Sequence, residues 1–226
     1  MTAFTDAVVD LCNAEYNAFS QGALKEYQKA VYKRVGKYWD ALALTPPYEN
    51  WAGYNGRTDS KLKLDAADEV VQVIRNGNQP WSAAFISWVA REAGAGAHFK
   101  YAPSHSVYIV AALKEARKAT STAKFIARRR TDYAPKVGDL IACERRADTD
   151  ANFDNYQAFV ASGRYEAHCD FVVGFNAART RVITVGGNVG HSVARKDWPL
   201  DANGRIGPKD PKSAAANVIC VIETRL

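Results

Sequence analysis

The fold of this chain is indicated by one apolar stretch, residues 80–88, which reads Pro-Trp-Ser-Ala-Ala-Phe-Ile-Ser-Trp. As a helix this stretch is apolar on nearly every side, and a helix of that kind is normally buried. Ser82 stands at its N-terminus, where free N–H groups and the helix dipole stabilise a developing negative charge. Ser82 is therefore a candidate nucleophile; the alternative is that its side chain only caps the helix.

Composition indicates a folded globular protein. The chain has 226 residues, of which 47% are hydrophobic and 24% charged, so a single domain over 1–226 is expected. The net charge of +6 favours an anionic partner, for which nucleic acid, lipid headgroups and an acidic cell-wall polymer are the options. The basic run 124–130 is interpreted as a solvated strand end, the alternative being an anion-binding rim.

The spacing of apolar residues changes along the chain from a helical to a strand period. The helical part, 1–79, precedes a core, 80–226, that contains the candidate nucleophile. We expect an α+β domain with helices on one face of an antiparallel sheet. The segment 145–166 is polar and is predicted to be an exposed insertion, and 176–180 is predicted to close a hairpin. Helices are predicted at 5–19, 23–44, 66–75, 81–94 and 106–118, and strands at 124–128, 138–144, 169–175, 181–185, 192–196 and 218–223.

A serine nucleophile needs a base and a third group that orients the base. Among the histidines, His168 begins an apolar strand and Asn188 follows the next strand. In antiparallel neighbours the start of one strand lies beside the end of the next, so His168 and Asn188 are expected to meet. The Asn188 side-chain oxygen would then accept from the imidazole N–H of His168.

Further residues are candidates for lining the same cleft. Strand alternation puts Asp170 on the side of His168 and Cys169 on the opposite, core-facing side. His105 either lines the cleft or begins a surface helix, and His191 either closes over the cleft or belongs to a mobile loop. No H-E-x-x-H or paired-cysteine motif is present, so neither a metal nor another cofactor is expected, and the scattered cysteines are interpreted as reduced thiols. The complete set of cleft-lining candidates is Trp81, His105, Asp170, Cys169 and His191, and the cysteines are Cys12, Cys143, Cys169 and Cys220.

The ordered motifs resemble the NlpC and CHAP branch of the papain-like superfamily. They are the Trp81–Trp88 stretch, Gly138-Asp139-Leu140, His168 and Gly187-Asn188. The chain is most similar to an uncharacterised bacterial family that carries Ser in the first motif, followed by H-C-D and G-G-N-V. The resemblance implies a papain-like fold, with an antiparallel sheet packed on a central helix and an N-terminal helical extension.

The same resemblance implies hydrolysis of an amide bond in peptidoglycan peptides. Ser82 would attack, His168 would be the base and Asn188 would orient His168. Members of the superfamily normally use Cys at the position of Ser82, because a thiol ionises far more readily than a hydroxyl. Three explanations stay open: a working serine nucleophile, a catalytically silent module that binds cell-wall peptide or a protein partner, and an engineered change from Cys to Ser.

The N-terminus and hydropathy bear on where the protein acts. Residues 1–6 lack the basic and apolar regions of a signal peptide, and no segment is apolar for long enough to span a bilayer. We therefore expect synthesis in the bacterial cytoplasm and signal-independent delivery to the periplasm or cell wall, as for an antibacterial effector toxin. The expected partners are peptidoglycan or its stem peptides and a cognate immunity protein; membrane and nucleic-acid partners are not expected.

Overall fold

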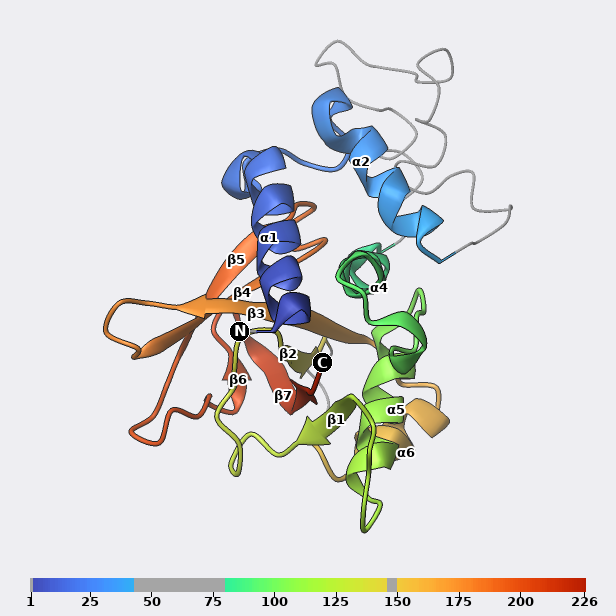
Figure 1. Ribbon diagram of the computed structural model, residues 1–226, viewed down its shortest axis with the longest axis vertical. Coiled ribbons are helices and arrows are strands. Elements are labelled where there is room, and N and C mark those ends of the chain that lie inside the picture. Colours follow the sequence, from blue (N-terminus) through green and yellow to red (C-terminus); the bar gives the residue numbers. More distant parts are fainter. Residues whose placement is uncertain (1, 43–79, 146–149) are drawn as a thin grey trace.

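The computed structural model describes residues 2–42, 80–145 and 150–226. Over these ranges the chain is a mixed α+β structure with an antiparallel sheet (Figure 1), and this part of the sequence-based prediction is confirmed. The predicted helix 66–75 lies outside the described residues. The α-helices are α1 (Ala3–Ala18), α2 (Lys29–Asp40), α4 (Ser82–Glu92), α5 (His105–Ala116) and α6 (Tyr156–Ala161).

The structure differs from the prediction for one helix and for one segment that was expected to be an exposed insertion. The helix predicted at 23–44 begins only at Lys29. The backbone before it bonds to the loop 187–193 instead: the N–H of Glu26 donates to the carbonyl of His191, and the carbonyl of Leu24 accepts from Oγ of Ser192. The segment 145–166, predicted to be an exposed insertion, contains α6, which carries the buried side chain of Tyr156. The helix has only six residues, which is too short for a clear periodic pattern, although Tyr156 and Phe159 are spaced as on one helix face.

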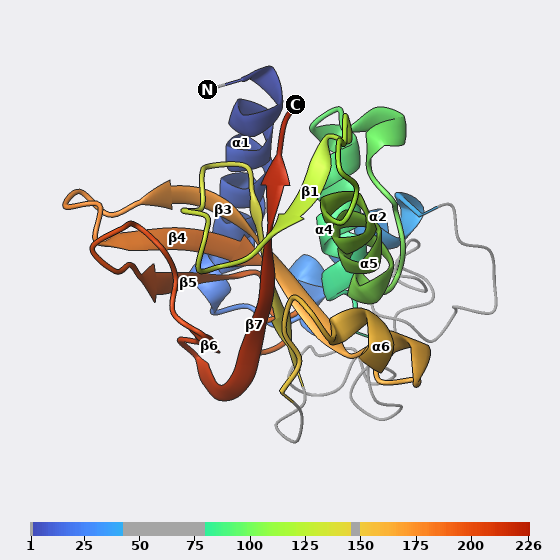
Figure 2. The ribbon, with the colours of Figure 1, turned by 90° about the horizontal axis from the view of Figure 1, so that it is seen from below.

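In the described part of the chain seven strands form the sheet, in the order β1-β7-β2-β3-β4-β5, with β6 paired to β7. The hairpin predicted around 176–180 is confirmed, since β3 and β4 pair in the register Phe171↔Val185. The last strand starts earlier than predicted because one of its ends pairs with β6 and the other with β1 and β2, and it bends between them (Figure 2). The strands are β1 (Phe125–Arg128), β2 (Leu140–Glu144), β3 (Ala167–Phe175), β4 (Arg181–Gly186), β5 (Ala194–Pro199), β6 (Lys209–Asp210) and β7 (Ser213–Thr224).

The helices α1, α4 and α5 contact one face of the sheet, as expected from the sequence. The opposite face forms a separate apolar cluster, in which Val172, Trp198 and Val221 pack with the loop residue Ile206. Helix α4 lies between α2 and strands β3 and β4, so it is central in the described structure (Figure 1). All its side chains from Ser82 to Ser87 are buried, which is what its all-round apolar sequence predicts.

The start of α4 is held by aromatic packing and by a close approach of the loop after β4. The Trp81 ring stacks on Phe19 at 5.9 Å and on Tyr38 at 5.4 Å, measured between ring centroids. A Cβ atom on Gly187 would come within 2.5 Å of the Cβ of Phe85. The loop after β4 can therefore approach α4 only because this position has no side chain.

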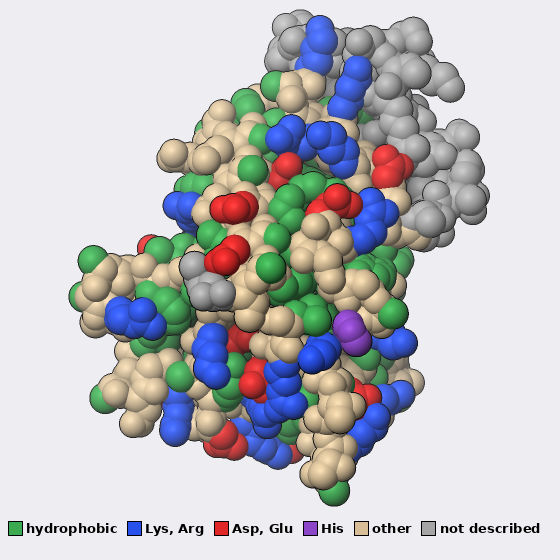
Figure 3. Space-filling view, viewed as in Figure 1, with side chains coloured by type: hydrophobic (Ala, Val, Ile, Leu, Met, Phe, Trp, Pro, Cys, Tyr) green, Lys and Arg blue, Asp and Glu red, His purple; other side chains and the backbone are tan. Residues whose placement is uncertain are grey.

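On the face drawn in Figure 3, basic and acidic side chains are intermixed. In the basic run, Arg128 lies 2.7 Å from Glu223, and Arg129 pairs with Asp154. These pairs favour the interpretation of the run as a solvated strand end. None of the helices in 2–42, 80–145 and 150–226 has the length and apolar character needed to cross a membrane.

Candidate active site

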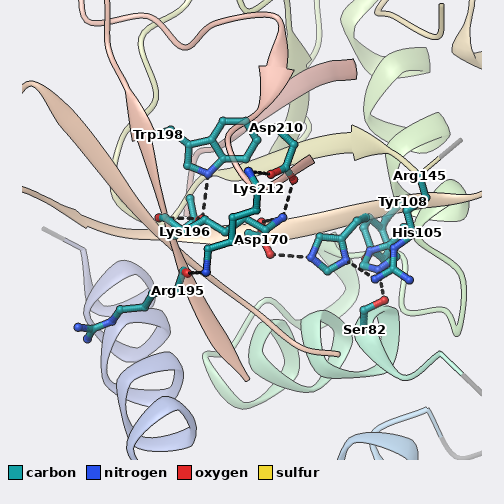
Figure 4. Close-up of polar contacts among 12 residues, drawn as sticks. Ser82, His105, Tyr108, Arg145, Asp170, Arg195, Lys196, Trp198, Asp210 and Lys212 are labelled. Carbon is teal, nitrogen blue, oxygen red and sulfur yellow. Dashed lines mark hydrogen bonds and ion pairs between the residues drawn. The ribbon is translucent and has the colours of Figure 1, made fainter. Parts of the chain in front are cut away.

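Two helices begin at the candidate site, α4 with Ser82 and α5 with His105. The Oγ atom of Ser82 lies 2.7 Å from Nε2 of His105 (Figure 4). Both side chains are buried, with 2% and 4% of their surface exposed. The histidine at hydrogen-bond distance from Ser82 is thus His105, and the predicted contact between Ser82 and His168 is wrong.

Tyr108, one turn further along α5, holds the other side of the His105 ring. Its hydroxyl is hydrogen-bonded to Nδ1 of His105. In the tautomer in which this hydroxyl accepts from Nδ1–H of His105, the Nε2 lone pair faces the hydroxyl of Ser82. Burial raises the pKa of Tyr108 well above its usual range, so the phenol stays neutral.

The pKa of His105 is well below its ordinary value of 6.5. Burial is the main cause, because it disfavours the charged imidazolium, and the positive charge of Arg145 lowers the pKa further. His105 is therefore neutral at pH 7 and able to accept a proton. The pair of Ser82 and His105 has the geometry and protonation state of a nucleophile with its general base.

His168 takes part in a different set of contacts. Its Nε2 lies 2.7 Å from Oδ1 of Asp170, and its Nδ1 accepts from the guanidinium of Arg145 at 3.2 Å. The acceptor for its N–H is thus Asp170 rather than the predicted Asn188, because residues two apart on a strand share a face. The rings of His168 and His105 lie edge to face with centroids 5.3 Å apart.

Asp170 is buried and belongs to an ionic network behind His168. Its Oδ2 lies 3.0 Å from Nζ of Lys196, which is also 2.6 Å from Oδ2 of Asp210. Despite burial, Lys196 and His168 hold the pKa of Asp170 below its usual range, so the carboxylate is ionised. A Cβ atom on Gly186 would lie 1.7 Å from Oδ1 of Asp170, so the absence of a side chain there leaves room for the network.

Ser82 and His105 open into a pocket of about 360 Å³. Its wall includes Ala83, which belongs to the first turn of α4, where the N–H groups have no partner within the helix. Such N–H groups can stabilise an oxyanion formed next to Ser82. Trp81, predicted to line the cleft, does not: it is fully buried in the core, where its indole N–H donates to Glu26.

The remaining predicted site residues lie elsewhere. Cys169 is fully buried and burial raises its pKa well above the usual range, which agrees with its interpretation as a core residue. The other three cysteines are also free and buried. His191 bonds Oε1 of Glu26 through Nδ1 at 2.7 Å and does not line the Ser82 pocket. Asn188, with φ of 55°, lines a neighbouring pocket together with His168.

Three residues of the site were not predicted from the sequence: Tyr108, Arg145 and Lys196. A signal for Tyr108 did exist, because residues three apart on a helix share a face and His105 begins the helix. Lys196 and Arg145 gave no such signal, since a strand lysine and an arginine after a strand are usually solvated. Burial and pairing of Lys196 are decided by the partner strands.

Within 2–42, 80–145 and 150–226, no group of three or more His, Cys, Asp or Glu side chains is arranged to hold a metal ion. Comparison with curated proteins and with solved structures gave no match. Comparison with family models gave one that spans most of the chain, residues 26–221. The chain therefore belongs to the family described as Uncharacterized protein conserved in bacteria (DUF2272).

Proposed function

We propose that this protein is a serine hydrolase that cleaves an amide bond in bacterial cell-wall peptides. The observation that carries the proposal is the 2.7 Å contact between Oγ of Ser82 and Nε2 of a neutral, buried His105, in an open pocket. The class of substrate rests on the sequence resemblance to the NlpC and CHAP branch of the papain-like superfamily. The place of action that follows from this substrate is the periplasm or cell wall.

In the proposed reaction Oγ of Ser82 attacks the carbonyl carbon while Nε2 of His105 takes the hydroxyl proton. The first-turn N–H groups of α4 stabilise the resulting oxyanion. His105 then donates the proton to the leaving amine, which departs and leaves an ester on Ser82. A water molecule gives a proton to His105 and attacks the carbonyl carbon of this ester. The bond to Oγ of Ser82 then breaks, the product carboxylic acid leaves, and His105 returns the proton to Oγ.

The openness of the pocket favours catalysis over the alternative of a silent binding module. A module that had lost its activity could fill the space in front of Ser82 without penalty, whereas here the pocket reaches both Ser82 and His105. Replacement of the usual Cys by Ser requires a base, since a serine hydroxyl is not ionised at neutral pH. His105 is such a base at the required distance.

The test is digestion of purified peptidoglycan with mass spectrometry of the released fragments. The parent protein should release peptides, and Ser82→Ala or His105→Gln should each lower the rate at least about a thousand-fold. The matched control is Ser87→Ala on the same helix, since Oγ of Ser87 bonds the carbonyl of Ala102 outside the pocket. His168→Gln distinguishes the two histidines: it should retain far more activity than His105→Gln.

A substrate-independent test uses a fluorophosphonate, which labels activated serines. Labelling should occur on Ser82 and should be lost in His105→Gln. Binding of the parent protein to peptidoglycan without fragment release and without labelling would contradict the proposal and favour the binding module. Cleavage only by Ser82→Cys would indicate that the parent site is silent.

A further inference from the structure

Arg145 stands between two pockets of the molecule. It directly follows β2, and it lines both the Ser82 pocket and a neighbouring pocket of about 230 Å³ that also contains His168 and Lys212. Figure 4 shows Arg145 next to His105 and Ser82. Arg145 is exposed, so a ligand that enters either pocket can reach its guanidinium. No step of the proposed reaction uses this residue.

Among the described residues, the guanidinium of Arg145 is held by an uncharged partner. It donates to Nδ1 of His168 at 3.2 Å, and this ring is uncharged at neutral pH because burial lowers the pKa of His168. Within the described residues Arg145 has no ion pair with any carboxylate. Its positive charge and its other N–H donors are thus directed to whatever occupies the pockets.

A buried network fixes this arrangement. Nε2–H of His168 donates to Asp170, which keeps the Nδ1 lone pair turned toward Arg145. Asp170 is in turn paired with Lys196, and Lys196 with Asp210, all at most 6% exposed. Burying such charges costs desolvation energy, and a positional role is one reason for a chain to retain them. Here the buried network fixes the ring of His168, and His168 in turn fixes the position of the Arg145 guanidinium.

The acidic side chains near Arg145 bond to other groups and do not occupy its guanidinium. In the neighbouring pocket Glu144 and Asp210 are buried and are bonded to Asn217 and Lys196. Glu166, at the wall of the Ser82 pocket, is exposed and has an interaction of its own. Among the described residues, Arg145 is consequently the charged group that lines both pockets.

We propose that Arg145 binds a carboxylate of the substrate next to the scissile bond, so that the preferred substrates are acidic peptides. A guanidinium recognises a carboxylate through two parallel hydrogen bonds, which give both affinity and orientation. This inference rests on the proposed function and specifies its substrate class. It also gives His168 a role, as the support of the binding residue rather than as the base.

Binding is measured first, in the inactive Ser82→Ala protein, by calorimetry. The probes are a synthetic stem peptide with all carboxylates free and the same peptide with its carboxylates converted to carboxamides. The free peptide should bind about ten- to a hundred-fold more tightly, as expected for a charge-assisted contact. Adding Arg145→Gln should abolish the difference, and Arg145→Lys should keep part of it. Arg91→Gln, at the far end of α4, is the matched control.

Turnover separates this inference from the proposed function. If the parent protein cleaves the free and the amidated peptide equally well, the function stands and the role of Arg145 is refuted. If no peptide is cleaved but Ser82→Ala binds the free peptide through Arg145, the carboxylate site stands and the hydrolase proposal fails. Equal binding of both peptides, or equal effects of Arg145→Gln and Arg91→Gln, would overturn the inference. Thermal melting of each variant controls for misfolding.

Discussion

His105 determines when Ser82 can react, because only the neutral imidazole can accept the hydroxyl proton. Its ring is enclosed by Ser82 on one side and Tyr108 on the other. Burial and neighbouring charges hold its pKa well below 6.5, so the neutral form persists into mildly acidic solution.

The pH profile of kcat/KM should show this shift directly. Activity needs the deprotonated His105, so it is present above the pKa and lost as pH falls through it. Because the pKa is lowered, kcat/KM should stay constant from about pH 8 down past the ordinary value of 6.5 and fall only below it. An acidic limb centred at or above the ordinary value would contradict the assignment.

Tyr108→Phe should lower kcat while leaving the fold intact. The change removes the hydroxyl that holds Nδ1 of His105, so the ring loses its preferred tautomer and orientation. We expect a decrease in kcat of about ten- to a hundred-fold with little change in KM. Tyr156→Phe, whose hydroxyl bonds the carbonyl of Tyr165, is the control and should keep the parent rate. A parent-like kcat in Tyr108→Phe would refute the orienting role.

Gly186→Ala should destabilise the protein through Asp170. The new Cβ atom would lie 1.7 Å from Oδ1 of Asp170 and 3.0 Å from Nε2 of His168, so one of the buried partners must move. The expected loss is about 1–3 kcal/mol in the free energy of unfolding, measured by urea denaturation. Gly174→Ala on β3 meets no atom within 4 Å and serves as the control. Equal stability of the two variants would show that the network is not tightly packed.

At the scale of elements, the position of Ser82 depends on how α4 begins. The N–H of the Trp81 indole donates to the buried carboxylate of Glu26, which also accepts from His191. The Trp81 ring is stacked between Phe19 and Tyr38. The segment between α1 and α2, the helix α2 and the loop after β4 thus all contact the residue that precedes the candidate nucleophile.

Glu26→Ala should therefore destabilise the fold more than an ordinary surface change. It leaves the indole N–H of Trp81 buried without its acceptor, at an expected cost of about 1–3 kcal/mol. Glu26→Gln keeps an acceptor oxygen and should lose less. The control is Glu92→Ala at the exposed end of α4, whose pair with Arg91 is solvated and contributes little. Chemical denaturation measures all three; similar values for Glu26→Ala and Glu92→Ala would refute the argument.

At the scale of the whole molecule, one apolar core joins the N-terminal helices to the sheet. It contains side chains of α1, α2, α4, α5 and the strands, among them Phe4, Val35, Phe85, Ile109 and Phe171. The division into 1–79 and 80–226 is therefore not a division into independently packed units. Removing the first part exposes the face of α4 that packs on α2 and the sheet residues that pack on α1.

A truncated chain of residues 80–226 should not fold on its own. It would lose the partners of Trp81 and of the sheet face under α1, and this burial is the main contribution to stability. Circular dichroism and limited proteolysis should show loss of the cooperative melting transition and rapid cleavage, in contrast to the full chain. A cooperative transition in the truncated chain would refute the prediction.

The elements of the fold could be predicted largely from the sequence, because they depend on local periodicity. The apolar stretch after Pro80 forms the buried helix expected of it, and Ser82 stands at its N-terminus. The two-residue period locates β3 and β4 and the hairpin between them. Alternation also places Asp170 on the face of His168 and Cys169 in the core. These properties follow from neighbours along the chain.

The tertiary structure decided which of these groups meet. His105 and His168 both begin an element, and periodicity assigns a face to a side chain but does not specify which distant side chain lies opposite. Because α5 begins next to the start of α4, His105 lies at hydrogen-bond distance from Ser82. The pairing of β3 with β4 placed Gly186 next to Asp170 and His168, where the missing side chain leaves room for their contact. Local sequence thus determined the elements, whereas the packing of elements far apart in the chain determined the candidate site.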